Sequence, residues 1–323
     1  MKRRYLFIVA VLILVFLICI AINLGSIKIP LYEIAEGFLG KQSERFIIVR
    51  DLRLPRILIA VFVGANLAVS GVLLQAVMQN PLVDPGITGV SSGASVIAIL
   101  VMLYLPQFYN ILPFASFLGG LFACFLVYSL AWKRGLSPIR IVLSGVAVNA
   151  FLGGISSILA ILNTDKIAGV LMWINGSMAS RGWKDVKVLS VYSIFGLIFS
   201  LFLYKSCNIL SLGEKNAKNL GTNINLNRLI LSLTAVFLAG VSTSIVGIIG
   251  FVGLIVPHIA RMLIGSNHKF LIPFSMLSGS ITLLLADTLA RTIAKPYEIP
   301  VGVVMAALGG PFFLYLLRRS DKR

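Results

Sequence analysis

Long runs of apolar residues, separated by short polar or glycine- and proline-containing stretches, extend along the whole chain. The runs cover residues 5–24, 57–78, 87–105, 111–132, 139–162, 186–206, 229–250, 254–265, 270–291 and 301–317. Most of them approach the roughly 20 apolar residues that a helix needs to cross a bilayer core. They are apolar on every side, which is typical of helices that face lipid or lie inside a bundle. The pattern predicts an all-α, polytopic membrane protein of about ten transmembrane helices in a single domain, residues 1–323.

The run at residues 254–265 is too short to cross the hydrocarbon core alone. We expect a half-helix that is enclosed by neighbouring helices rather than by lipid. Pro257 removes a backbone donor from this run, and His258 and Arg261 add polar side chains three residues apart. Together with the glycines that precede them, these residues predict a kinked structural turn.

Composition supports a lipid environment. Hydrophobic residues make up 58% of the 323 residues and charged residues 12%, whereas about a quarter of a soluble domain is charged. The net charge of +17 does not indicate nucleic-acid binding, because the basic residues form short clusters between apolar runs rather than one basic face. Composition therefore excludes an ordinary soluble domain and makes the lipid bilayer the expected surrounding.

Basic residues cluster at both ends of the chain: Lys2, Arg3, Arg4, Arg318, Arg319, Lys322 and Arg323. Lys and Arg close to the ends of spans favour the cytoplasmic side, so both termini are predicted to be cytoplasmic. The connections then predicted inside are residues 133–138 and 205–228. Those predicted outside are residues 25–56, 163–185 and 292–300. The first outer connection carries Arg45, Arg50, Arg53 and Arg56, so these arginines need a role other than orientation.

Asp287 and Arg291 stand four residues apart within one apolar run. Each charge alone would cost roughly 2.5–3.5 kcal/mol in the middle of a bilayer. An internal ion pair along the helix would lower that cost. The alternative is that Arg291 serves at the outer surface.

Motifs of soluble and metal-dependent enzymes are absent from the sequence. No stretch matches the phosphate-binding pattern G-x-x-x-x-G-K-[ST], and the two histidines, His258 and His268, form no H-E-x-x-H motif. Three widely spaced cysteines suggest neither a disulfide framework nor a metal site. We therefore predict no catalytic residues, no cofactor and no bound metal.

Residues 210–221 form the most informative polar stretch, within a predicted cytoplasmic loop over residues 209–228. Gly213 and Gly221 bracket a short amphipathic segment, with Leu210 and Leu212 as candidate apolar anchors. Such a helix could dock into a groove of a cytoplasmic partner. The alternative is a solvated connector between two spans.

A set of motifs in chain order resembles one known family. The motifs are Leu52-Arg53-Leu54-Pro55-Arg56, Asn80-Pro81-Leu82, Trp173…Gly176-Ser177, Leu212-Gly213-Glu214, Val256-Pro257-His258…Arg261, Ala286-Asp287…Arg291 and Glu298-Ile299-Pro300. In residue identity and in order along the chain, these motifs resemble those of the FecCD-type permeases of iron–siderophore and cobalamin ABC importers. The resemblance extends over nearly the whole chain.

The resemblance implies a permease in the bacterial plasma membrane that forms a homodimer or a close heterodimer. Its expected partners are two cytoplasmic ABC ATPases and an extracytoplasmic substrate-binding protein. In the family, arginines in the matching positions meet glutamates of the binding protein. The resemblance thus assigns a docking role to Arg53, Arg56 and Arg291.

The resemblance also assigns residues on the cytoplasmic side. Coupling to the ATPase is assigned to Leu212, Gly213, Glu214 and Gly221. The cytoplasmic gate is assigned to Asn80, Pro81, Leu82, Ser137, Pro138 and Ile139. The family often has a polar residue in place of Pro138, so this chain departs from the pattern there.

The predicted function is therefore the permease subunit of a binding-protein-dependent importer, with a ferric siderophore as cargo and ATP hydrolysis on another chain. Cobalamin and haem are alternative cargoes for the same machinery. An ion-coupled secondary transporter is an alternative of another class. Such transporters carry ionisable residues in mid-span, and only Asp287 comes close here. A membrane enzyme lacks a catalytic cluster.

Overall fold

The computed structural model describes residues 2–24, 30, 33, 36–37, 43–133, 135–164, 167–294 and 297–320. Within them the helices are α1 (Lys2–Asn23), α3 (Glu44–Ile48), the π-helical η1 (Val49–Arg53), α4 (Leu54–Met78), the 3-10 helix η2 (Pro85–Thr88), α5 (Val90–Tyr104), the 3-10 helix η3 (Pro106–Ile111), α6 (Leu112–Ala131), α7 (Pro138–Ile161), α8 (Ile167–Ile174), α9 (Trp183–Phe202), α10 (Tyr204–Leu210), α11 (Glu214–Asn219), α12 (Ile224–Val246), α13 (Val252–Ile264), α14 (His268–Thr292) and α15 (Val301–Ser320).

Each of the ten predicted apolar runs corresponds to a helix. In the described residues, seven helices are long and apolar enough to cross a membrane, and three shorter apolar helices are α5, α13 and the first part of α15. The all-α, polytopic fold class is confirmed. One boundary differs from the prediction, because the helix that was expected from residue 57 continues back through η1 to Glu44.

Helix α4 lies at the centre of the bundle and packs against α14, α12, α13 and α9. Two close crossings depend on the absence of side chains. A Cβ added at Gly64 would collide with the carbonyl of Gly279 on α14, and one added at Gly71 with the carbonyl of Gly253 on α13. Small residues at such positions let backbones approach closely, which is how helices associate in lipid.

Polar side chains also join α4 to its neighbours. The amide of Asn66 donates to the hydroxyls of Ser193 on α9 (2.7 Å) and Ser242 on α12 (3.1 Å). The hydroxyl of Ser70 donates to the carbonyl of Ala235, also on α12, at 2.7 Å. Hydrogen bonds between membrane helices contribute about 0.6 kcal/mol each, so this set fixes the register of α4 more than its stability.

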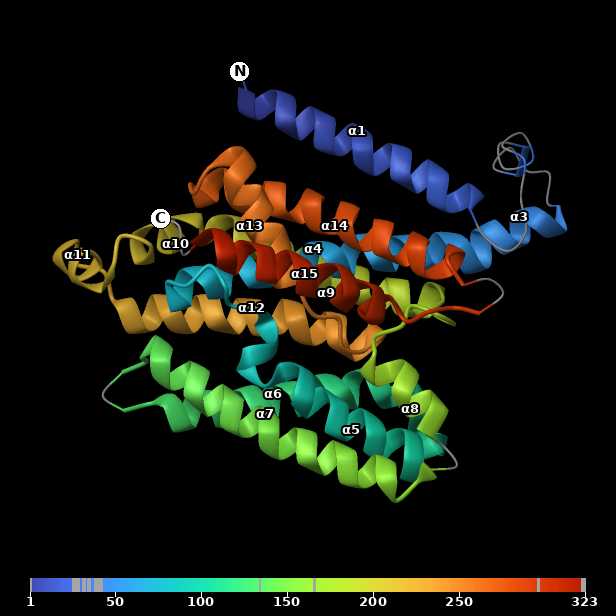
Figure 1. Ribbon diagram of the computed structural model, residues 1–323, viewed down its shortest axis with the longest axis horizontal. Helices are drawn as coiled ribbons and strands as arrows, with labels where there is room; N and C mark the ends of the chain where they lie inside the picture. The colour runs from blue at the N-terminus through green and yellow to red at the C-terminus, as the bar shows by residue number, and fades with distance from the viewer. Residues whose placement is uncertain are drawn as a thin grey trace.

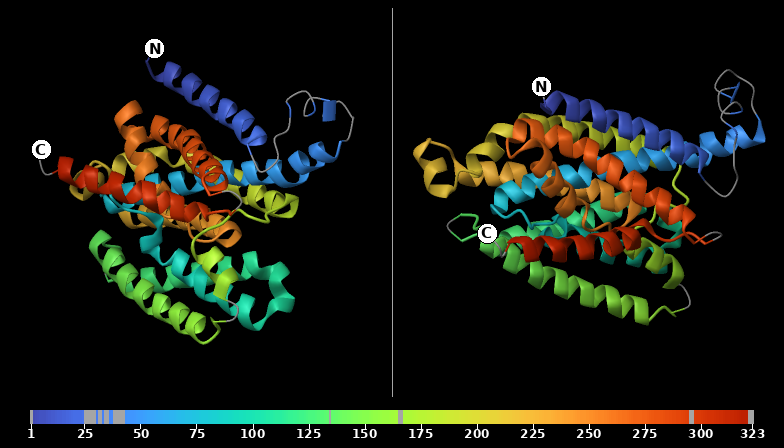
Figure 2. Two further views of the ribbon diagram at one scale, coloured as in Figure 1. Left: turned by 45° about the vertical axis from the view of Figure 1, so that its right-hand side comes forward. Right: turned by 45° about the horizontal axis from the view of Figure 1, so that its top comes forward.

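The long helices run side by side along one axis (Figure 1). Helices α5, α6 and α7 form a layer on one side of α12, and α1 packs on α14 at the opposite border. The N-terminal end of α1, the C-terminal end of α15 and α11 lie toward one end of the bundle, which we call the α11 end. Helices α3 and α8 lie at the other end, the α3 end (Figures 1 and 2).

The half-helix prediction is confirmed, whereas the predicted turn lies elsewhere. Helix α13 has 13 residues and a largely buried surface. The chain reverses before it, at residues 247–251, where Gly247 and Phe251 both have positive φ angles (78° and 68°). Pro257, His258 and Arg261 lie inside α13 instead. Pro257 has no N–H to donate to the carbonyl of Gly253 four residues before it, and the amide of Gln75 on α4 donates to that carbonyl instead, at 3.2 Å.

Candidate functional site

Charged side chains gather at the α3 end of the bundle in what we call the ion cluster: Arg56, Asp287, Arg291 and Glu298. The carboxylate of Asp287 is fully buried and lies 2.9 Å from the guanidinium of Arg56 and 3.3 Å from that of Arg291. Glu298, in the loop before α15, pairs with Arg56 at 2.8 Å. Two positive and two negative charges therefore neutralise one another where α4, α14 and this loop meet.

The predicted pairing of Asp287 with Arg291 is confirmed. The guanidinium of Arg291 also donates to the carbonyl of Ala21 at the end of α1, at 3.3 Å. Arg53 is only 6% exposed and donates to the carbonyls of Ile22 and Asn23. Both arginines thus hold the end of α1 against the core.

The three arginines that were assigned to docking, Arg53, Arg56 and Arg291, therefore lie together at one end of the molecule and all have partners within the chain. Their docking role stays a prediction. The sequence pattern did not find Glu298 as a partner of Arg56, because the two residues are 242 positions apart.

The predicted coupling residues lie at the α11 end, around the short helix α11 that juts out there (Figure 1). Gly213 and Gly221 bracket α11 with positive φ angles of 92° and 71°, which explains glycine at both positions. Leu212 is 55% exposed, as an apolar anchor should be. The expectation for Leu210 is wrong, since its side chain is fully buried in the core, where α10 packs against the bundle.

Glu214 connects α11 to the rest of the bundle. Its carboxylate pairs with Lys218 at 3.0 Å and with Arg228 of α12 at 3.4 Å. A hydrogen bond from Lys218, together with the charge of Arg228, lowers the pKa of Glu214 below its ordinary value. This contact is present while the carboxylate is ionised and is lost as the pH falls through the lowered pKa.

Arg228 is a residue that the sequence analysis missed. Its side chain is buried, and its guanidinium donates to the carbonyl of Leu136 at 2.7 Å. Leu136 stands immediately before Ser137 and Pro138, which begin α7. Arg228 thus joins the coupling segment to one predicted gate segment through two short contacts.

The two predicted gate segments lie at the α11 end. Asn80, Pro81 and Leu82 follow α4, whose last turn ends at Gln79 in a left-handed conformation. The side-chain oxygen of Asn80 accepts from the backbone of Leu82 at 2.9 Å, and Gln79 donates to the carbonyl of Leu210 at 2.8 Å. In the second segment, Ile139 is exposed. No hydrogen bond joins the two segments in the described part of the chain, and their gating role stays a prediction.

Arg261 and Gln75 connect α13 to α4 near the α11 end. The guanidinium of Arg261 donates to the side-chain oxygen of Gln75 at 2.8 Å, and the amide of Gln75 donates to the carbonyl of Gly253 at 3.2 Å. These contacts tie both ends of the half-helix to one long helix. Arg261 is therefore a packing residue of α13 rather than part of the turn.

A cavity of about 450 Å³ opens between α5, α7 and α8. We call it the serine-lined cavity, because many of its lining residues are small and polar: Gly86, Ser91, Ser92, Ser95, Asn149, Gly153, Ser156 and Ser157. Ser92 donates to Asn149 at 2.6 Å, and Asn149 donates to the carbonyl of Gly86 at 3.0 Å. The hydroxyl of Ser156 is buried and has no partner among the described residues. The remaining lining residues are apolar: Ala160, Leu171, Ile174 and Ile248. The cavity therefore offers hydroxyl and amide partners on one part of an otherwise apolar wall.

Comparison with known proteins gives a match over almost the whole chain. The model of the FecCD transport family matches residues 13–319. The chain belongs to the FecCD transport family. Members are permease subunits of ABC importers, so the chain is not itself an enzyme. This decides between the function classes that the sequence left open, against both an ion-coupled transporter and a membrane enzyme.

Individual relatives agree with the family. The chain is 42% identical to the Fe(3+)-citrate import system permease protein YfmD of Bacillus subtilis, over 99% of this chain and 96% of that protein. It is 40% identical to the "Probable heme-iron transport system permease protein IsdF" of Staphylococcus aureus, over 99% and 98%. This FecCD permease is therefore similar to multi-pass proteins of bacterial cell membranes.

Solved structures confirm the architecture. One is an inward-facing conformation of a metal-chelate type ABC transporter, with a TM-score of 0.87 and 32% identity over 98% of this chain and 99% of that chain. A second, PsaBC from Streptococcus pneumoniae in complex with Fab, has a TM-score of 0.58 and 17% identity over 88% and 95%, and shows likeness of fold alone.

The ion cluster leads to a prediction about stability. Asp287→Asn leaves Arg291 buried without a carboxylate, and breaking a buried pair in this way costs about 3–5 kcal/mol. Glu298→Gln is the matched control, because Glu298 is 44% exposed and an exposed pair contributes only about 0–1 kcal/mol. Thermal unfolding of the purified FecCD permease in detergent, followed by tryptophan fluorescence, should show a clearly lower midpoint only for Asp287→Asn. Equal midpoints for the two variants would contradict the structural role of Asp287.

Proposed function

We propose that this FecCD permease is the membrane-spanning subunit of an importer for a hydrophilic ferric chelate of the siderophore class, ferric citrate included. Its relatives include one named for Fe(3+)-citrate and one named for heme-iron, so the names alone leave the cargo open. The observation that carries the choice is the serine-lined cavity. Hydroxyl and amide groups can replace the water around the oxygen atoms of a ferric chelate, whereas the flat apolar ring of haem would gain little from them.

The serine-lined cavity also supports a dimer. Helix α7, which forms one wall of it, presents long exposed apolar side chains such as Ile139, Leu143 and Phe151. We infer that two copies of the permease meet so that their cavities form one path, with α5, α7 and α8 of each copy as its walls. Two cytoplasmic ATPases would then bind at the α11 ends, and the substrate-binding protein at the α3 ends.

Uptake of radioactive iron tests the cargo. Cells that lack the gene should lose uptake of one hydrophilic ferric chelate from a panel of citrate, hydroxamate and catecholate complexes, and the restored gene should return it. In addition, Ser156→Leu fills the serine-lined cavity and should reduce that uptake. Ser129→Leu is the matched control, because Ser129 bonds only within its own helix α6. Iron uptake unchanged across the panel, with loss of haem or cobalamin uptake, would contradict the proposed cargo.

Coupling to the ATPase is proposed to run from α11 through Glu214 and Arg228 to the start of α7. Binding of ATP closes the two ATPases, α11 moves with them, and the contact from Arg228 to Leu136 carries that movement to the gate at Ser137 and Pro138. The energy comes from the higher affinity of the nucleotide for one of the two states.

Charge reversal at Glu214 tests this route. Glu214→Arg places two guanidinium groups together, so loss of the coupling free energy, about 1–3 kcal/mol, should lower uptake per ATP hydrolysed by roughly 5–150-fold. Lys215→Glu is the matched control, since Lys215 is exposed on the same helix. The measurement is ATPase activity and chelate uptake in the same proteoliposomes. If uptake per ATP hydrolysed stays at the wild-type level in Glu214→Arg, Glu214 does not couple the two subunits.

We propose that the binding protein docks on Arg56, and that Arg56 exchanges one of its two ion-pair partners when it does so. The guanidinium of Arg56 keeps its contact with buried Asp287, while an acidic residue of the binding protein replaces the half-exposed Glu298. Ion pairs at a rim add little affinity, about 0.2–1 kcal/mol, but they orient the partner and speed its association. Arg53 and Arg291 would act by holding the end of α1 beside this contact.

The exchange predicts a gain of affinity. Glu298→Gln removes the internal competitor, so the association rate of the binding protein should rise by about two- to fivefold at low salt. The double variant with Arg56→Gln should lose that gain. Association is measured by surface plasmon resonance on the permease in nanodiscs, with Glu44→Gln as the matched control of equal charge. A rate in Glu298→Gln that equals or falls below that of the control would refute the exchange.

A further inference from the structure

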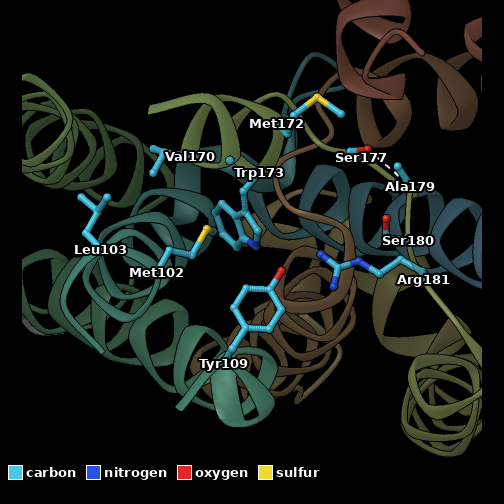
Figure 3. A pocket seen from close by; sticks show the side chains of 11 residues that line it. Met102, Leu103, Tyr109, Val170, Met172, Trp173, Ser177, Ala179, Ser180 and Arg181 are labelled. Carbon is cyan, nitrogen blue, oxygen red and sulfur yellow. Dashed lines mark hydrogen bonds between the residues drawn. The ribbon is translucent and has the colours of Figure 1, made fainter. Parts of the chain in front are cut away.

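A second cavity, of about 580 Å³, is shown in Figure 3. It is lined in part by α8, which lies at the α3 end of the bundle. Its walls are α5, η3, α8 and the loop that follows α8. We call it the donor cavity, because its polar groups are an indole, a guanidinium, a phenol and two hydroxyls, from Trp173, Arg181, Tyr109, Ser177 and Ser180. None of the described residues that line it carries a carboxylate.

The indole of Trp173 is the least expected of these groups. Trp173 is only 4% exposed, and its Nε1 donor has no partner within the described chain. Arg181 likewise has a buried Nε without an acceptor. Figure 3 shows that the indole nitrogen, the guanidinium and the hydroxyl of Tyr109 all point into the same space. A buried donor without a partner costs about 1–3 kcal/mol, so the two buried donors, from Trp173 and Arg181, need an acceptor from outside the described residues. The exposed hydroxyl of Tyr109 can add a third bond to the same acceptor.

The chemistry of the cavity defines that acceptor. A guanidinium and an indole can only donate hydrogen bonds, so the ligand must supply acceptor atoms and negative charge. Charge-assisted bonds from a guanidinium to an oxyanion are about twice as strong as neutral ones. The volume lies within the range of about 300–1,000 Å³ for small-molecule sites. A partly open cavity of this size fits a small oxyanion-bearing molecule.

The donor cavity lies next to the proposed path. Helix α8 separates the two cavities, since Val170 and Trp173 line the donor cavity while Leu171 and Ile174 line the serine-lined cavity. A ligand in the donor cavity would thus be one helix away from the serines. A hydrogen bond fixes the loop that carries Arg181 to the α3 end. Trp183, two residues after Arg181, donates to the carbonyl of Arg50 at 3.0 Å.

We propose that Trp173, Arg181 and Tyr109 form an oxyanion site that holds a carboxylate group of the iron chelate at the outer mouth of the path. This inference rests on the proposed function, which places the α3 end outside and makes a ferric chelate the cargo. The inference narrows the proposed substrates to ferric chelates that carry free carboxylates. The site would bind these chelates and would not bind neutral ones. The site would receive the chelate on release from the binding protein.

Calorimetric titration of the full-length permease in phosphatidylcholine nanodiscs tests the site, with gallium citrate as the redox-inert probe. Arg181→Gln should weaken binding about tenfold or more, and Trp173→Phe, which keeps an aromatic ring but removes the donor, by a smaller factor. Arg45→Gln is the matched control, because Arg45 lies at the same end and pairs with Glu33 outside this cavity. In cells, Arg181→Gln should raise the KM for ferric citrate uptake while the maximal rate is kept, a change that general misfolding would not produce.

The outcomes separate the site from the proposed function. Binding of gallium citrate that depends on Arg181, in a permease whose cells import no ferric chelate, supports the site and refutes the function. Ferric citrate uptake with binding and KM unchanged in both variants supports the function and overturns the site. Absence of gallium citrate binding by the wild type also overturns it. So does loss of wild-type binding when phosphatidylglycerol is added to the nanodiscs, because the oxyanion would then be a lipid headgroup.

Discussion

The carboxylate of Asp287 lies without access to water between two guanidinium groups, and much of the α3 end is arranged around it. A lone charge at this depth would be too costly to keep. Arg56 brings the first turn of α4 to it, and Arg291 adds the end of α1 through the carbonyl of Ala21. Glu298 then draws in the loop before α15. Four segments that are far apart in the sequence are therefore held in one place by the need to neutralise one carboxylate.

The same principle operates at the α11 end, with a different result. Arg228 and Arg261 are also guanidinium groups inside the bundle, but their shortest bonds go to uncharged groups of neighbouring segments, the carbonyl of Leu136 and the amide oxygen of Gln75. The carboxylate that Arg228 also meets, that of Glu214, is 49% exposed and 3.4 Å away. Such bonds exchange more easily than a buried ion pair. Helix α4 extends from the ion cluster to Gln75 and Gln79. One end of this central helix is thus fixed by charge, while the other touches the coupling segment and the half-helix through neutral contacts, which is a suitable division for a protein that must change shape.

The apolar runs predicted the helices well because in lipid the length of an apolar stretch is itself the physical requirement for a span. The half-helix α13 was predicted for the same reason, because its apolar run is too short to cross the bilayer. Sequence was less informative wherever the partner is distant along the chain. The sequence around Arg56 does not indicate that Glu298 is its ion-pair partner. The sequence around Arg228 does not indicate that its guanidinium bonds to the carbonyl of Leu136. Leu210 and Leu212 look alike in sequence, yet one is buried and the other exposed, since only the packing of α10 distinguishes them. The position of the turn was predicted wrongly, because Pro257 suggests a break in the helix. The chain turns instead at residues 247–251, where Gly247 and Phe251 have positive φ angles.

Polar groups around α4 hold its neighbouring helices in place, whereas some polar groups of the described residues beside α8 line cavities. Around α4, Asn66, Ser70 and Ser280 each donate to a neighbouring helix, as buried donors must where there is no water. In the two cavities beside α8, by contrast, the hydroxyl of Ser156 and the indole nitrogen of Trp173 are buried without partners in the part of the chain that the structure describes. Buried hydroxyls without partners occur elsewhere in the described residues too, for example at Ser232 and Ser275, but in the two cavities the open groups lie beside a space that a ligand can enter. The indole of Trp173 lacks an acceptor, and a molecule that enters the cavity with oxygen atoms able to accept hydrogen bonds would supply it.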